Sequence, residues 1–125
     1  MIHIVTQHFG TQAWFEIQKN HIEKYTPDKG LYKVHLLVYK TTVPEDFELP
    51  SNYEVINLDE KDNIRNDHYA IVEECYDRFI KEKVEDDDIV IYMDNDAFPI
   101  DGMWSYKIME YLQNNHICAV HRYED

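Results

Sequence analysis

Hydrophobic and polar positions along the chain follow two different periods. Short apolar runs, typical of strands, occur at 2–6, 33–39, 53–58, 89–93 and 117–121. Apolar side chains three or four positions apart, typical of amphipathic helices, occur at 12–25, 66–83 and 102–114. The pattern predicts strands that alternate with helices, which indicates an α/β fold with a mostly parallel sheet flanked by helices.

Two details of the pattern predict how these elements pack. In the helix 12–25, the apolar and aromatic positions at helical spacing predict the stripe that faces the sheet, namely Trp14, Ile17, His21, Ile22 and Tyr25. The run at 89–93 is the most strongly apolar, which predicts the most buried strand of the sheet. With only 3 glycines and 4 prolines, the chain has little length for linkers, so we expect a single domain over residues 1–125.

The charge of the chain limits its partners. Asp and Glu number 25 against 12 Lys and Arg, which gives a formal net charge of −13. This field repels nucleic acid and anionic lipid, so neither is expected as a partner. It also repels a nucleotide diphosphate, unless a divalent cation reverses the local sign.

The cysteines and the N-terminal residues bear on location. Cys75 and Cys118 lie in apolar stretches, where they are expected as small buried side chains and not as a disulfide framework. The first residues show no signal peptide, and no run approaches the roughly 18 apolar residues that cross a bilayer. We expect a soluble, cytoplasmic protein.

Two aspartates follow the apolar run 89–93, with one residue between them. An extended backbone directs residues i and i+2 to the same side, so Asp94 and Asp96 offer two oxygen ligands of the kind that Mg²⁺ or Mn²⁺ prefers. The same residue type is common in turns and helix caps, which is the alternative interpretation of both. Ligands of parallel sheets bind beyond the carboxyl ends of the strands, here 6–8, 57–68 and 94–96, and this position favours the metal.

The segment 89–100, with the sequence IVIYMDNDAFPI, resembles the D-x-D strand end of GT-A glycosyltransferases, most of all their small bacterial, phage and viral members. The shared features are an apolar strand, the two aspartates, a small residue, an aromatic residue and proline. The segment 118–122 is similar to the strand that follows in those enzymes. The resemblance implies a Rossmann-like GT-A nucleotide-diphospho-sugar transferase fold and a metal-dependent transfer of sugar.

The resemblance also implies roles for particular residues. Asp96 would bind Mn²⁺ or Mg²⁺ directly, and Asp94 would contact both the metal and the ribose of a UDP- or GDP-sugar. The donor-binding residues implied by position at the strand ends are Thr6, Gln7, His8, Asp67, His68 and Asp94. The acceptor would be a glycan, a lipid or a protein that the sequence does not name.

Several alternatives stay open. GT-A enzymes often carry an acidic residue after the second strand, where this chain has 39–41 (YKT), and their acceptor half follows a segment of this length. A chain that ends at Asp125 is therefore expected to be truncated, so it acts as a donor-binding module or needs a second chain or copy. A phosphatase-like hydrolase that uses D-x-D as nucleophile and acid, and a purely structural acidic domain, are the other two hypotheses.

Overall fold

The computed structural model describes residues 1–61 and 68–115 of the chain. The regular elements in chain order are β1 (Ile2–Phe9), α1 (Phe15–Tyr25), β2 (Tyr32–Tyr39), β3 (Tyr53–Asn57), α2 (His68–Cys75), β4 (Ile89–Asp94) and α3 (Trp104–Leu112). A 3₁₀ turn, Leu58–Glu60, follows β3, and α2 continues through a π-helical turn, Tyr76–Ile80, into a 3₁₀ turn, Lys81–Lys83. The strands predicted up to residue 93 and the three helices are confirmed, and the strand predicted at 117–121 lies outside the described residues.

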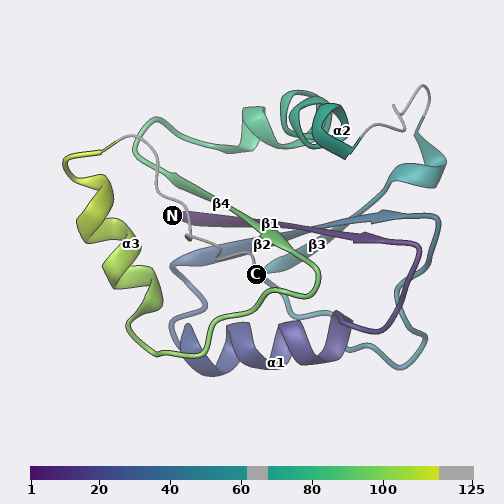
Figure 1. Ribbon diagram of the computed structural model, residues 1–125, viewed down its shortest axis with the longest axis horizontal. Coiled ribbons are helices and arrows are strands. Elements are labelled where there is room, and N and C mark those ends of the chain that lie inside the picture. Colours follow the sequence, from purple (N-terminus) through teal and green to yellow (C-terminus); the bar gives the residue numbers. More distant parts are fainter. Residues whose placement is uncertain (62–67, 116–125) are drawn as a thin grey trace, which may run out of the picture.

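The four strands form one parallel sheet in the order β3-β2-β1-β4. Helix α1 covers one face of this sheet and α2 covers the other, while α3 lies beyond the end of α1 (Figure 1). The predicted α/β fold with a parallel sheet is therefore confirmed. None of the helices in the described part of the chain is long and apolar enough to cross a membrane.

The sheet is buried on both faces because successive side chains of a strand point to opposite sides. On the α1 face, Ile4 packs with Phe15 and Ile22 of the helix. On the α2 face, Val5 packs in a second cluster with Ile71 and Cys75. Full burial of one such aliphatic side chain stabilises a fold by roughly 1.5–3 kcal/mol. The expectation of a buried Cys75 is confirmed, and Cys118 lies outside the described residues.

The stripe of α1 that faces the sheet agrees with the predicted one at Ile22 and differs from it elsewhere. Phe15, Gln18 and Ile22 are the buried residues of the helix, whereas Ile17 is 38% exposed. The prediction followed hydrophobicity alone, and the buried stripe contains a polar residue at a core position. Thr26 N–H closes the helix on the carbonyl of Ile22.

The most apolar strand is not the most buried one. β1 and β2 occupy the centre of the sheet, and β4 lies at an edge of its described part, where its residues are half-buried or exposed. The apolar run at 89–93 predicted burial from composition, but burial depends on the number of neighbouring elements, and among the described residues β4 pairs with β1 alone. The aspartates therefore follow a strand at the edge of the described sheet.

Candidate functional site

The carboxyl ends of β1 and β4 bring one predicted pair of site residues together. Gln7 and Asp94 are register partners across the two strands, and the Gln7 Nε2 amide donates to Asp94 Oδ1 at 3.3 Å. From β1 the chain adds β2 and β3 on one side and then β4 on the other, so the strand order reverses between β1 and β4. Open α/β sheets bind their ligands outside the strand ends at such a switch point.

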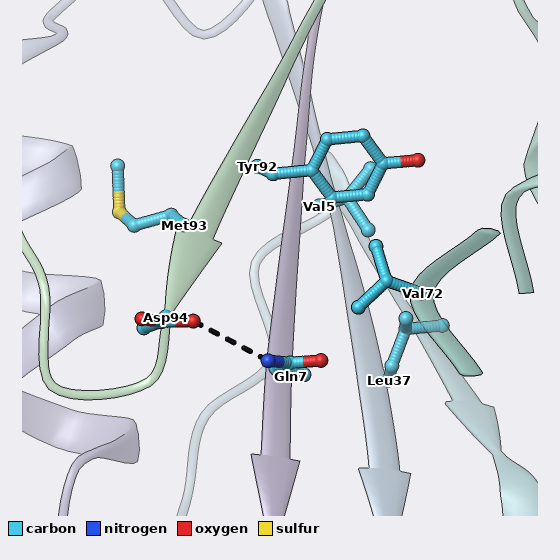
Figure 2. A pocket seen from close by; sticks show the side chains of 7 residues that line it. All are labelled: Val5, Gln7, Leu37, Val72, Tyr92, Met93 and Asp94. Carbon is cyan, nitrogen blue, oxygen red and sulfur yellow. Dashed lines mark hydrogen bonds between the residues drawn. The ribbon is translucent and has the colours of Figure 1, made fainter. Parts of the chain in front are cut away.

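A pocket of about 190 Å³ lies on the α2 face beside this pair. Its lining residues are Val5, Gln7, Leu37, Val72, Tyr92, Met93 and Asp94. Figure 2 shows Gln7 with its nitrogen turned toward Asp94 and its oxygen turned the other way. Gln7 Oε1 is buried and has no hydrogen-bond partner among the described residues. Because a buried acceptor without a partner costs about 1–3 kcal/mol, this oxygen marks a place for a donor from a ligand or from water.

The two aspartates of the D-x-D segment are both exposed, but they do not lie on one extended strand. β4 ends at Asp94, and Ala97 N–H donates to the carbonyl of Asp94 at 3.0 Å, which closes a β-turn. The alternation rule on which the prediction relied therefore ends at Asp94, and the turn sets the place of Asp96. Within the described residues, no group of three or more His, Cys, Asp or Glu side chains could hold a metal. A cation here would take these two carboxylates, water and substrate oxygens, which suits Mg²⁺ or Mn²⁺.

Gln18 fixes this turn from inside the protein, and it was not among the predicted site residues. Its side chain is 2% exposed, and its Nε2 amide donates to the carbonyls of Asp94 at 2.9 Å and Ala97 at 3.0 Å. Its Oε1 accepts from Thr6 Oγ1 and from His8 Nε2, both at 3.0 Å. All four hydrogen-bonding positions of the amide are used, so the turn is tied to both β1 and α1. The sequence signal was a glutamine at a core position of an amphipathic helix.

Thr6 and His8 were predicted to bind the donor, but their side chains lie inside the protein. Thr6 is 1% exposed and His8 is 0% exposed, because alternation along β1 directs both toward α1. The His8 ring stacks on Phe15 with 3.9 Å between centroids, and burial lowers its pKa, although the hydrogen bond to Gln18 opposes this. Both side chains support Gln18, and in this structure neither is accessible to a ligand.

The two other residues predicted to bind the donor are Asp67 and His68, which follow β3. Asp67 lies outside the described residues, and His68 is the first residue of α2. β3, which precedes them, is separated from β1 by β2, so the end of β3 does not adjoin the switch point. Of the predicted set, Gln7 and Asp94 line the pocket, and Asp96 lies in the turn beside it.

Comparisons of the chain with models of protein families, with curated proteins and with solved structures find no match.

Proposed function

We propose that this edge of the sheet binds a nucleotide-sugar through Mg²⁺ or Mn²⁺ and that the protein is a metal-dependent glycosyltransferase. One observation carries the proposal. The exposed carboxylate of Asp94 stands at the switch point of a parallel sheet and is hydrogen-bonded to Gln7, which lines the adjacent pocket and whose buried oxygen has no partner among the described residues. The likeness of 89–100 to the GT-A strand end supplies the reaction class, and the position supplies the physical support.

The residues present suit a hard divalent cation. Asp96 is assigned as the direct metal ligand, and Asp94 is assigned to the metal and the ribose. Gln7 bonds one oxygen of Asp94, and the described residues make no hydrogen bond to the other. At a net charge of −13, the protein repels a diphosphate unless a cation neutralises it. Bound there, the cation stabilises the charge of the leaving diphosphate as a Lewis acid.

The pocket suits one ring of such a donor. Its volume of about 190 Å³ is below the roughly 300–1,000 Å³ of pockets that enclose whole drug-sized ligands. Val5, Leu37 and Val72 give it apolar walls, and Gln7 Oε1 offers an acceptor. Uracil and guanine both present a ring N–H, so the base of a UDP- or GDP-sugar matches this chemistry. The diphosphate would then extend from the pocket over the turn.

The test is a calorimetric titration of UDP and GDP into the chain, first with Mn²⁺ and then with EDTA. Binding is expected with the metal only. Asp94→Ala and Asp96→Ala are each expected to reduce nucleotide affinity by about 100-fold or more, because each removes a metal ligand. Asp87→Ala is the matched control, since it removes an equal charge at the opposite end of β4 and should leave the affinity unchanged. Equal affinity in wild type and Asp96→Ala would refute the proposal.

Transfer itself needs a second measurement. Hydrolysis or transfer of UDP- and GDP-sugars is followed with and without candidate glycan acceptors, in the presence of Mn²⁺. Turnover that Asp96→Ala abolishes supports the transferase. Metal-dependent binding without any turnover would instead indicate a donor-binding module.

A further inference from the structure

Two buried histidines lie side by side at the amino end of the sheet, far from the switch point. His3 of β1 is 3% exposed and His35 of β2 is 0% exposed. Their rings are nearly parallel, with 5.2 Å between centroids and 17° between planes. His3 Nδ1 and His35 Nε2 are 2.9 Å apart, which is a hydrogen-bond distance. Both residues are on the α2 face, where His35 is the register partner of Val5, two residues along β1 from His3.

A carboxylate closes each end of this pair. His3 Nε2 lies 2.9 Å from Asp88 Oδ2, which belongs to the turn before β4. His35 Nδ1 lies 2.5 Å from Glu54 Oε1 on β3. All four ring nitrogens are therefore engaged in a line of three hydrogen bonds. The line runs from the turn before β4 across β1 and β2 to β3.

The three hydrogen bonds of this line need more N–H protons than two neutral histidines carry. A carboxylate only accepts, so each outer contact requires an N–H on the histidine. The central contact between the two rings requires one more. Two neutral imidazoles carry only two N–H groups, and the line requires three. With two protons, one contact would bring two lone pairs together at 2.9 Å or less.

We propose that His3 and His35 form a buried binding site for one proton, so that the pair carries three N–H protons and a single positive charge between Asp88 and Glu54. The site lies apart from the proposed nucleotide site and does not depend on it. Its ligand is a proton, and its recognition elements are the two flanking carboxylates. Opposite charges within about 4–6 Å favour the charged form of an ionisable group.

The neighbouring charges support this count. The backbone N–H of Glu85 and then the ring of His3 hold the pKa of Asp88 at about 2, so this carboxyl is ionised at neutral pH. On the other side, partial burial opposes ionisation of Glu54, but hydrogen bonds from Lys83 and His35 leave its pKa lowered. Both ends of the line are therefore acceptors, and neither supplies the missing proton.

The two outer contacts fix two of the three protons, one on His3 Nε2 beside Asp88 and one on His35 Nδ1 beside Glu54. The third proton lies in the central contact between His3 Nδ1 and His35 Nε2. Burial lowers the pKa of His35, as do the neighbouring His3 and Lys33, although the contact with Glu54 opposes this. Asp88 also pairs with the N-terminal ammonium at 3.2 Å.

Other charged groups surround the pair. Lys33 and Lys83 approach Glu54, at 3.9 and 2.7 Å, and partly offset its charge. His3 lines a polar hollow whose other charged groups are Lys33, Lys83 and the N-terminal ammonium of Met1, together with Glu82, Glu85, Asp86, Asp87 and Asp88. The five carboxylates outnumber the three cationic groups, so the hollow as a whole favours a cation over an uncharged ring.

Nitrogen NMR of the histidine rings in the full chain tests the proposal directly. At pH 6 to 7, the assigned rings of His3 and His35 are expected to show three protonated nitrogens and one acceptor nitrogen. On raising the pH, the pair is expected to lose one proton in a single step seen on both rings. Two protonated nitrogens throughout, or two independent steps, would overturn the inference.

A charge-removing variant tests the role of the carboxylate. Asp88→Asn keeps an oxygen that accepts from His3 and removes the charge, so the pH midpoint of proton loss is expected to fall by about one unit or more. Asp87→Asn removes the same charge one residue away and is expected to shift the midpoint by only a few tenths of a unit. Equal midpoints in the two variants would contradict the site. If Asp88→Asn does not fold, Glu54→Gln makes the same change at the other end, compared with the exposed Glu60→Gln on the turn after β3.

Discussion

Gln18 uses its whole side-chain amide inside the protein, and this makes one residue responsible for the turn that carries the aspartates. Gln18→Met has a similar shape but leaves two carbonyls and the partners on Thr6 and His8 without their hydrogen bonds. Buried groups that lose a partner cost about 1–3 kcal/mol each, partly relieved by relaxation, so the free energy of unfolding is expected to fall by about 2–4 kcal/mol. Urea denaturation measures it. Gln12→Met is the control, because Gln12 is exposed and, within the described part of the chain, its side chain bonds only Thr42.

The variant Gln18→Glu distinguishes a contribution of Gln18 to stability from a contribution to metal binding. A carboxylate still accepts from Thr6 and His8 but cannot donate to the carbonyls of Asp94 and Ala97. Mn²⁺ affinity, measured by calorimetry under conditions where the variant is folded, is expected to fall by about 10-fold or more, as for other groups that orient metal ligands. Unchanged Mn²⁺ affinity would show that Gln18 stabilises the fold without positioning the turn. Absence of Mn²⁺ binding in the wild type would instead count against the proposed function.

Single residues also show how far the sequence could predict the site. Asp94 and Asp96 could be singled out because two carboxylates follow an apolar strand with one residue between them, and their role as metal ligands stays a prediction. The inward orientation of Thr6 and His8 could not be predicted, because hydrophobic periodicity does not indicate which side of a strand faces a helix when both sides are covered. Gln7 lies between them in sequence, and alternation alone directs it into the pocket instead of the core.

At the scale of elements, α2 forms the wall of the pocket opposite β4. Val72→Phe is expected to fill part of the 190 Å³ and to reduce nucleotide affinity at least about tenfold, while Mn²⁺ affinity without nucleotide stays unchanged. Calorimetry with and without nucleotide measures both. Glu73→Phe places the same ring at the next, exposed position, and removes a negative charge that opposes an anionic ligand. Loss of affinity in Glu73→Phe equal to that in Val72→Phe would show that the pocket is not the binding place.

The helix from 66 to 83 was predicted as one regular amphipathic element, and its second half is not regular. After Cys75 the backbone makes a π-helical turn, which buries Ile80 and leaves Phe79 half-buried. The prediction placed Phe79 and Ile80 on one apolar face, and both contact the same cluster: Ile80 is buried in it, and Phe79 packs against it partly buried. The sequence does not show this difference in burial, because it depends on neighbours distant along the chain. The position of β4 at an edge of the described sheet was unpredictable for the same reason.

For the whole molecule, an excess of acidic groups has two opposite effects on stability as the pH falls. Ordinary exposed carboxylates begin to take up protons near pH 4–5, which relieves the repulsion of a chain at −13. Asp88, with its pKa near 2, and Glu54, with a lowered pKa, behave differently because the folded state needs them ionised. The unfolded chain protonates these two first, so the stability they contribute is present above about pH 4 and is lost as the pH falls toward 2.

The free energy of unfolding, measured by urea denaturation from pH 7 to pH 2.5, is therefore expected to rise slightly toward pH 5 and then to fall steeply. Asp88→Asn should be less stable than the wild type at pH 5 and should approach it at pH 2.5, because the unfolded chain is by then protonated at Asp88 and most of the stability that the ionised carboxylate contributes is lost. Asp87→Asn should follow the wild-type curve, since the structure gives Asp87 no hydrogen bond or ion pair within the described residues. If Asp88→Asn loses as much stability between pH 5 and pH 2.5 as the wild type does, the hydrogen-bonded line from Asp88 across β1 and β2 to β3 is not what acid disrupts. The steep loss would then come from other carboxylates.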